Sequence, residues 1–149
     1  VLTRLSVDDN LRAAGSLLDQ LEPTLSDTYA LFPELAERKG QIAGTLSGGQ
    51  QQMVALAHAM MCRPRFLLID EMSLGLAPLV VKRLMGFVAG LRDRGVGVLL
   101  IEQFTDLALG VADDAIVLRS GKMRYSGPAK ALLEDPAKLD AAYFGGENS

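Results

Sequence analysis

The chain has 149 residues, of which 49% are hydrophobic and 22% are charged, and its formal net charge at pH 7 is -3. This length and balance are typical of one soluble globular domain. The acidic charge excludes a protein that coats nucleic acid or anionic lipid through bulk charge. The single cysteine, Cys62, excludes an internal disulfide, and its apolar helical surroundings predict a buried thiol in a reducing compartment.

No apolar run approaches the roughly 18 residues that a membrane span requires. Arg4, Asp8 and Asp9 interrupt the N-terminal stretch, so it does not have the apolar centre of a signal peptide. We therefore expect a cytoplasmic protein that does not insert into a membrane.

The first part of the chain is predicted to be helical. Ser6 can cap a helix, with Asp9 three residues later, and apolar residues then recur at helical spacing at Leu11, Ala14, Leu17, Leu18 and Leu21. This helix is expected to end at Pro23. A second helix is predicted over 26–38, where Pro33 either splits it or marks its first turn.

The middle of the chain contains a helix, a strand and a second helix. Residues 47–61 carry a one-sided stripe of Met53, Leu56, Ala57, Met60 and Met61. Residues 66–69 form an apolar run that is too short for a helix and predicts a parallel strand buried on both faces. Pro78 suits the first turn of the next helix, whose expected buried stripe is Leu79, Val80, Leu84, Phe87, Val88 and Leu91.

The last third of the chain is predicted to alternate strands and helices. We expect a strand at 96–101, a helix at about 104–111, a strand at 115–118, a hairpin turn at Ser120-Gly121, a strand at 122–125, and short helices at 128–133 and 136–143. Such alternation is typical of α/β folds with parallel sheets. The final residues, 145–149, are expected to fray.

The segment from Ser47 to Gln50 has the Ser-x-x-Gln pattern of a capping box, and plain helix capping is one interpretation of it. Gly48 and Gly49 favour a second interpretation, because each costs a helix about 1 kcal/mol relative to alanine. Bare backbone at a helix N-terminus lets an anion approach the free amide groups. The residues themselves therefore favour anion binding and leave capping open.

Two carboxylates, Asp70 and Glu71, follow the strand at 66–69, and Gln103 follows the strand at 96–101. Ligands of open α/β sheets bind beyond these carboxyl ends. One carboxylate there can hold Mg²⁺ through water, the other can orient or deprotonate a water, and an amide can contact a phosphate. The alternative is that all three are solvated loop residues. One histidine and one cysteine exclude a zinc site built from these residue types.

Taken together, these residues resemble the nucleotide-binding subunit of ABC transporters. Residues 46–50, Leu-Ser-Gly-Gly-Gln, match the signature motif of that family, and residues 66–71 match its Walker B strand and catalytic glutamate. The separation of Gln50 and Asp70 agrees with the family's spacing. Gln103 stands in the place of the family's switch histidine.

Further segments are similar to one branch of the family, the ATPases of branched-chain amino acid importers. These segments are residues 32–35, 73–78, 101–103 and 142–146. The ATPases of urea importers share the glutamine but usually carry a different sequence after the Walker B strand. The resemblance therefore favours amino acid import.

The resemblance implies an α/β fold, namely a partial P-loop NTPase core with parallel strands plus an α-helical subdomain. The expected division is a helical subdomain at 1–62 and the C-terminal part of the ATPase core at 63–149. In this family two ATPase subunits enclose two ATP molecules and act on membrane permease subunits at the inner face of the cell membrane. ATP and Mg²⁺ are therefore the expected ligands.

The resemblance also assigns roles to single residues. Ser47, Gly48, Gly49 and Gln50 would meet the γ-phosphate of ATP held on the phosphate loop of the partner. Asp70 would hold Mg²⁺ through water, Glu71 would position the hydrolytic water, and Gln103 would sense the γ-phosphate.

The sequence departs from the family in one important respect, because it contains no Gly-x-x-x-x-Gly-Lys loop. Met72 and His58 also replace the proline and arginine common at their positions. We expect the C-terminal part of an importer ATPase that binds ATP weakly and hydrolyses none alone. The alternative is a non-catalytic module that offers its signature motif to a complete partner. A chromosome or DNA-repair ATPase is disfavoured, because no heptad run occurs, and no nucleic-acid partner is expected.

Overall fold

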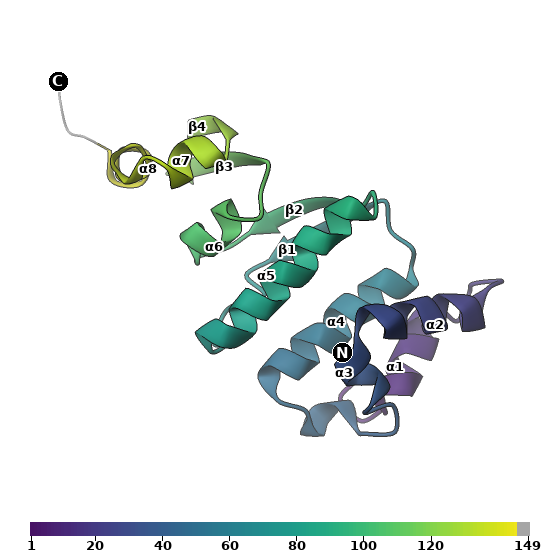
Figure 1. Ribbon diagram of the computed structural model, residues 1–149. Coiled ribbons are helices and arrows are strands. Elements are labelled where there is room, and N and C mark those ends of the chain that lie inside the picture. Colours follow the sequence, from purple (N-terminus) through teal and green to yellow (C-terminus); the bar gives the residue numbers. More distant parts are fainter. Residues whose placement is uncertain (146–149) are drawn as a thin grey trace.

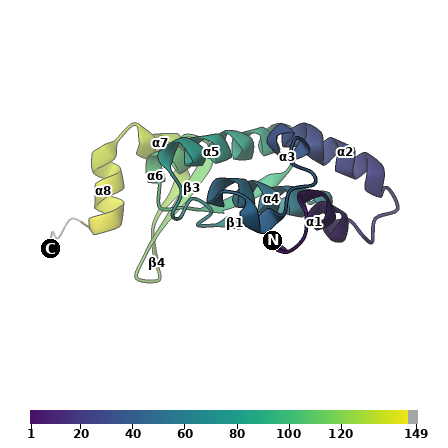
Figure 2. The same ribbon diagram turned by 90° about the horizontal axis from the view of Figure 1, so that it is seen from below.

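The computed structural model describes residues 1–145 and is elongated, with helices gathered at one end and a hairpin at the other (Figures 1 and 2). The first end holds α1 (Val7–Ala14), α2 (Leu21–Leu31), α3 (Pro33–Ala36), the short helical turn η1 (Ala43–Thr45) and α4 (Gly48–Met61). Strands β1 (Phe66–Asp70) and β2 (Gly97–Ile101) and helix α5 (Pro78–Asp93) lie in the middle. The other end holds α6 (Thr105–Leu109), β3 (Asp114–Arg119), β4 (Lys122–Pro128), α7 (Lys130–Leu133) and α8 (Pro136–Phe144).

Both predicted N-terminal helices have different limits in the structure. Helix α1 starts after the Ser6 cap as predicted, but it ends at Ala14, and Leu17 beyond it is 97% exposed. Pro23 lies in the first turn of α2, where its missing amide hydrogen costs no hydrogen bond. Pro33 stands at the first position of α3 and thereby splits the second predicted helix.

Helix α4 follows its predicted limits and is central to the larger core. Leu56, Ala57 and Met61 of its predicted stripe are buried, and Val54 is fully buried as well. The prediction of a buried thiol at Cys62 is wrong, because this residue lies just past the last turn of α4 and is exposed.

Strands β1 and β2 are parallel neighbours, as predicted, with Leu67 opposite Val98 and Ile69 opposite Leu100. Leu67 and Ile69 are buried in the core that α4 and α5 share. Burial on both faces is wrong for the described residues, because the opposite face is open to solvent. That open face is formed by Phe66, Leu68, Leu99 and Ile101, whose exposed fractions are 73%, 75%, 55% and 52%.

Helix α5 begins at Pro78 as predicted, but its buried stripe is rotated from the predicted one. The buried residues are Val81, Leu84, Met85, Val88 and Leu91, which recur at helical spacing. Leu79, predicted to be buried, is 72% exposed.

Strands β3 and β4 form an antiparallel hairpin around the predicted turn at Ser120-Gly121. In the described part of the chain β3 does not join β1 and β2 in one parallel sheet, contrary to the alternation rule. A groove of about 880 Å³ lies between β2 and β3.

Pro128 ends β4 instead of opening a helix, and α8 confirms the last predicted helix. The expected fraying of the tail falls mostly on residues 146–149, which lie outside the described residues.

One apolar core continues from Val7 in α1 to Val96 before β2, and a smaller core runs from Leu109 to Ala142. The first core includes α4 together with β1 and α5. The division of the chain into domains at residue 62 stays a prediction.

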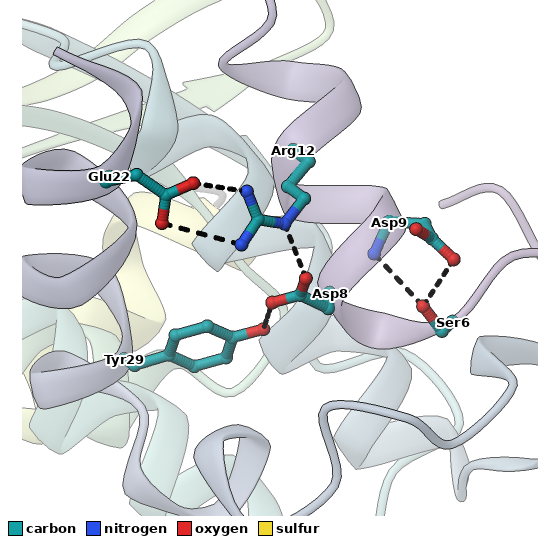
Figure 3. A network of polar contacts seen from close by, with 6 residues as sticks. All are labelled: Ser6, Asp8, Asp9, Arg12, Glu22 and Tyr29. Carbon is teal, nitrogen blue, oxygen red and sulfur yellow. Dashed lines mark hydrogen bonds and ion pairs between the residues drawn. The ribbon is translucent and has the colours of Figure 1, made fainter.

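A polar network ties α1 to α2 (Figure 3). The hydroxyl of Tyr29 donates to Oδ1 of Asp8 at 2.8 Å, and Nε of Arg12 donates to Oδ2 at 2.6 Å. Arg12 also pairs with Glu22. Burial acts to raise the pKa of Asp8, but the hydrogen bonds from Arg12 and Tyr29 outweigh it and lower that pKa. Burial and the bond to Asp8 raise the pKa of Tyr29.

Candidate functional site

The predicted capping box at the start of α4 is complete. The backbone amide of Gln50 donates to Oγ of Ser47 at 3.4 Å, and the amide of Ser47 donates to Oε1 of Gln50 at 3.0 Å. Ser47 and Gly48 are exposed, and Gln50 is half-buried. The first turn of α4 is therefore well capped and still open to solvent at Ser47 and Gly48, where further amide groups of the helix end have no intrahelical partner.

The two glycines after Ser47 have different surroundings. A Cβ atom on Gly49 would overlap Cγ1 of Val80, so the close packing of α4 on α5 requires a glycine there. A Cβ atom on Gly48 would lie 3.3 Å from Cδ2 of Leu76, which is a milder contact. Packing thus accounts for Gly49, and only Gly48 keeps the bare, exposed backbone that an anion can approach.

Asp70 and Glu71 stand at the carboxyl end of β1, next to the end of β2. Asp70 is the register partner of Ile101, and the amide of Glu71 donates to the carbonyl oxygen of Ile101 at 2.9 Å. Glu71 has a φ of 46°, which is uncommon for a residue other than glycine. This turn brings its carboxylate to Gln103, whose Nε2 donates to Oε1 of Glu71 at 3.1 Å. The predicted neighbours Glu71 and Gln103 are therefore in contact.

A second link between the two strand ends was missed from the sequence. Ser73 is 2% exposed, and both its amide, at 3.2 Å, and its hydroxyl donate to the carboxylate of Glu102. Ser73 lies two residues after Glu71, and Glu102 directly precedes Gln103. The adjacency of polar residues after neighbouring strands could have indicated this contact, which fixes the loop after β1 to the end of β2.

The donor groups at the strand ends fit only one kind of Mg²⁺ site. Asp70 and Glu71 are exposed carboxylates, and no group of three or more possible metal-ligating side chains occurs within residues 1–145. This part of the chain therefore offers no cluster of three such side chains to a metal ion. One or two carboxylates suffice where water and substrate phosphates supply the remaining oxygens, so Asp70 suits a water-mediated magnesium beside a bound triphosphate.

The signature segment and the strand-end residues form two separate groups. Within the described residues no hydrogen bond joins residues 47–50 to Asp70, Glu71 or Gln103. The loop after β1 contacts the signature segment through Leu76, which lies near Gly48, and Val80 of α5 abuts Gly49. The chain thus presents an exposed helix N-terminus and a carboxylate-amide pair that share no hydrogen bond among the described residues.

Comparison with known proteins identifies the family. A family model described as "ABC transporter" matches residues 2–73. The branched-chain amino acid transport ATP-binding protein BraG of Pseudomonas aeruginosa is 43% identical over 148 residues, which cover 98% of this chain and 63% of BraG. The chain is similar over nearly its whole length to an ATP-binding protein of the ABC transporter family. The resemblance of residues 46–50 and 66–71 to the family's motifs is thereby accounted for.

A second relative carries a similar name, and a solved structure has a similar fold. The probable branched-chain amino acid transport ATP-binding protein LivF of Archaeoglobus fulgidus is 34% identical over 137 residues, covering 90% of this chain and 58% of LivF. The structure of cbiO1 from Clostridium perfringens superposes with a TM-score of 0.83 at 20% identity, covering 93% of this chain and 58% of that one, and shows the fold. The predicted fold class, a partial P-loop NTPase core with helices, is confirmed.

The chain spans about three fifths of the length of these curated relatives. Helices long and apolar enough to cross a membrane are lacking among the described residues.

Proposed function

We propose that this chain takes part in ATP hydrolysis that drives the uptake of amino acids, of which branched-chain amino acids are the favoured class. The choice of branched-chain amino acids rests on the similarity to BraG and LivF, whose names state their transport. It also rests on the segments that resemble the ATPases of branched-chain amino acid importers. The observation that carries the ATPase role is the contact between Glu71 and Gln103 at the ends of two parallel strands. A carboxylate and an amide so placed can hold a water and a phosphate oxygen together.

In this proposal each strand-end residue has one task. Asp70 would hold Mg²⁺ through water, and that ion would supply charge neutralisation at the phosphates. Glu71 orients the attacking water and accepts its proton, a type of help typically worth about 10²–10⁴ in rate. Gln103 remains a neutral donor that ties the Glu71 carboxylate to the γ-phosphate position. The Ser73–Glu102 link keeps the loop that carries Glu71 next to Gln103.

The signature segment acts on a different nucleotide. Ser47 and Gly48 are exposed at the N-terminus of a 14-residue helix, where amide groups and the helix dipole favour a γ-phosphate. Gln50 holds the cap, and Gly49 lets α4 lie close to α5. In this proposal a second ATPase subunit carries the phosphate that meets Ser47, and the lack of any hydrogen bond between residues 47–50 and Glu71 or Gln103 supports it.

The partners follow from this arrangement. A second ABC ATPase subunit pairs with this chain in a homodimer or a heterodimer. The subunit whose nucleotide meets Ser47 must contain a Gly-x-x-x-x-Gly-Lys phosphate loop, which does not occur in these 149 residues. Permease subunits carry the amino acid and hold the ATPase pair on the cytoplasmic face of the membrane. A second candidate function is a module that only offers Ser47–Gln50 to a complete partner, and the exposed, capped start of α4 supports it.

An ATPase assay on residues 1–149 tests both functions. Alone, the chain is expected to hydrolyse no detectable ATP, because little in it binds the β- and γ-phosphates. Ordinary turnover that Glu71→Gln abolishes would overturn this expectation. Mixed with an intact homologous subunit, the chain is expected to change the turnover of that subunit. If the two proteins do not associate and the rate does not change, both candidate functions are contradicted.

A further inference from the structure

A hollow of about 490 Å³ lies at the end of the molecule away from α4, between the β3–β4 hairpin and α8. Three cationic side chains line it: Arg119 at the end of β3, Arg124 in β4 and Lys138 in the first turn of α8. No acidic side chain is among the described lining residues, although the whole chain has a net charge of -3. The positive charge is therefore local to this hollow.

The hairpin is irregular where it lines the hollow. Val117 pairs with Tyr125 whereas Leu118 pairs with Met123, so Arg124 is an extra residue in the described ladder. Consecutive side chains of a regular strand point to opposite faces, and a β-bulge re-aims one of them. Because of the bulge, Arg124 and its neighbour Tyr125 both line the same hollow.

The wall of the hollow is held in place by several contacts. The hydroxyl of Tyr125 donates to the carbonyl oxygen of Pro128 at 2.8 Å, and Nζ of Lys138 lies 5.1 Å from the centre of the Tyr125 ring. The guanidinium of Arg119 lies against Gly145, where a Cβ atom would overlap it. The cationic side chains of β3, of the bulge in β4 and of α8 thus line the same hollow.

Among residues 1–145, none of these three cations forms an ion pair with a carboxylate, whereas Arg12, Arg83 and Arg92 do. Like charges that converge repel one another, and a bound anion relieves this repulsion. Guanidinium groups match phosphate oxygens with paired hydrogen bonds. The volume of the hollow falls within the range of small-molecule sites, about 300–1,000 Å³.

We propose that this hollow binds a small, soluble, phosphate-bearing anion through Arg119, Arg124 and Lys138. The site is separate from Ser47 and from Glu71, and it does not depend on the ATPase role proposed above.

Titration of the 149-residue chain with pyrophosphate, followed by NMR of the backbone amides, tests the proposal. Saturable shifts are expected at Gly127 and Gly145. The variant Arg119→Gln/Arg124→Gln is expected to bind about tenfold more weakly, and Lys138→Gln severalfold more weakly. The control Arg63→Gln/Arg65→Gln removes the same charge outside the hollow and is expected to bind as the wild type does.

Three outcomes would overturn the proposal: no saturable binding, shifts confined to the amides near Gly48, or equal weakening in the two double variants. A lipid headgroup presents the same chemistry, so sedimentation with phosphatidylglycerol vesicles is a second arm. The vesicles are expected to retain no protein. If the vesicles retain the wild-type chain but not the Arg119→Gln/Arg124→Gln variant, the site binds a membrane surface, and the proposal of a soluble ligand is overturned.

Discussion

Gly48 and Gly49 are adjacent glycines of the same motif, yet they have different surroundings and different roles in the structure. Gly49 is buried where α4 meets Val80 of α5, whereas Gly48 is exposed beside the Ser47 cap. The sequence argument from helix propensity could not separate them, because the neighbour that makes Gly49 necessary, Val80, lies thirty-one positions later in another helix. The adjacency of Glu71 and Gln103, by contrast, could be predicted, since parallel strands end at one edge.

Replacing Gly49 with alanine is expected to destabilise the chain by about 1–3 kcal/mol, because the added methyl group overpacks the contact with Val80. The free energy of unfolding from urea titration measures this. The matched control is Gly86→Ala in the middle of α5, where a Cβ atom meets nothing within 4 Å, and which is expected to gain up to about 1 kcal/mol. The cost of Gly49→Ala should shrink when Val80 is also alanine, and an unchanged cost would refute the packing argument.

Asp8 provides a prediction about pH. Its pKa is lowered in the folded chain, so its contribution to stability is present above the unfolded value of about 3.9 and is lost as the pH falls through the folded pKa. The Asp8→Asn variant should therefore be less stable than the wild type at neutral pH. On acidification, its free energy of unfolding should fall by less than that of the wild type. Urea titrations at pH 7 and below about pH 4 measure the difference. Asp27→Asn, at an exposed site in α2, is the control, and an equal acid response in Asp8→Asn and wild type would contradict the account.

At the scale of elements, periodicity predicted most helices and all four strands, and it failed where tertiary contacts decide. The stripe of α5 is rotated by about one position, because Met85 rather than Leu79 meets the core. Strands β1 and β2 pair as predicted, but their continuous apolar sequence does not tell whether both faces are covered. In residues 1–145 only the face of Leu67 and Ile69 is covered.

The open face of β1 and β2 is expected to make the chain self-associate, because contiguous exposed apolar residues and unpaired strand edges favour aggregation. The variant Leu68→Thr/Leu99→Thr should reduce association without loss of stability, since both side chains are more than half exposed. Sedimentation velocity over a range of protein concentrations checks this. The control Leu67→Ala removes a buried side chain and should cost about 2–5 kcal/mol. Association that persists undiminished in the threonine variant would show that another surface is responsible.

At the scale of the whole molecule, the chain carries two groups of proposed functional residues that share no hydrogen bond in its described part. The Ser47 end faces solvent at the start of α4, and Glu71 with Gln103 lies at the ends of β1 and β2. Composition and motifs indicated the family, and the comparisons confirm it. The sequence alone could not show that the groups are separate, because that depends on how α4, α5 and the loop after β1 pack.

The measurement that tests this account most directly uses a complete homologous ATPase whose own signature serine has been replaced, so that it is inactive as a dimer. Adding residues 1–149 should restore ATP hydrolysis, because Ser47 and Gly48 complete the site on the phosphate loop of the partner. The Gly48→Asp variant should restore none, since its carboxylate repels the γ-phosphate, whereas Glu71→Gln should restore as much as the wild type. No restoration by the wild-type chain, or equal restoration by Gly48→Asp, would contradict the account.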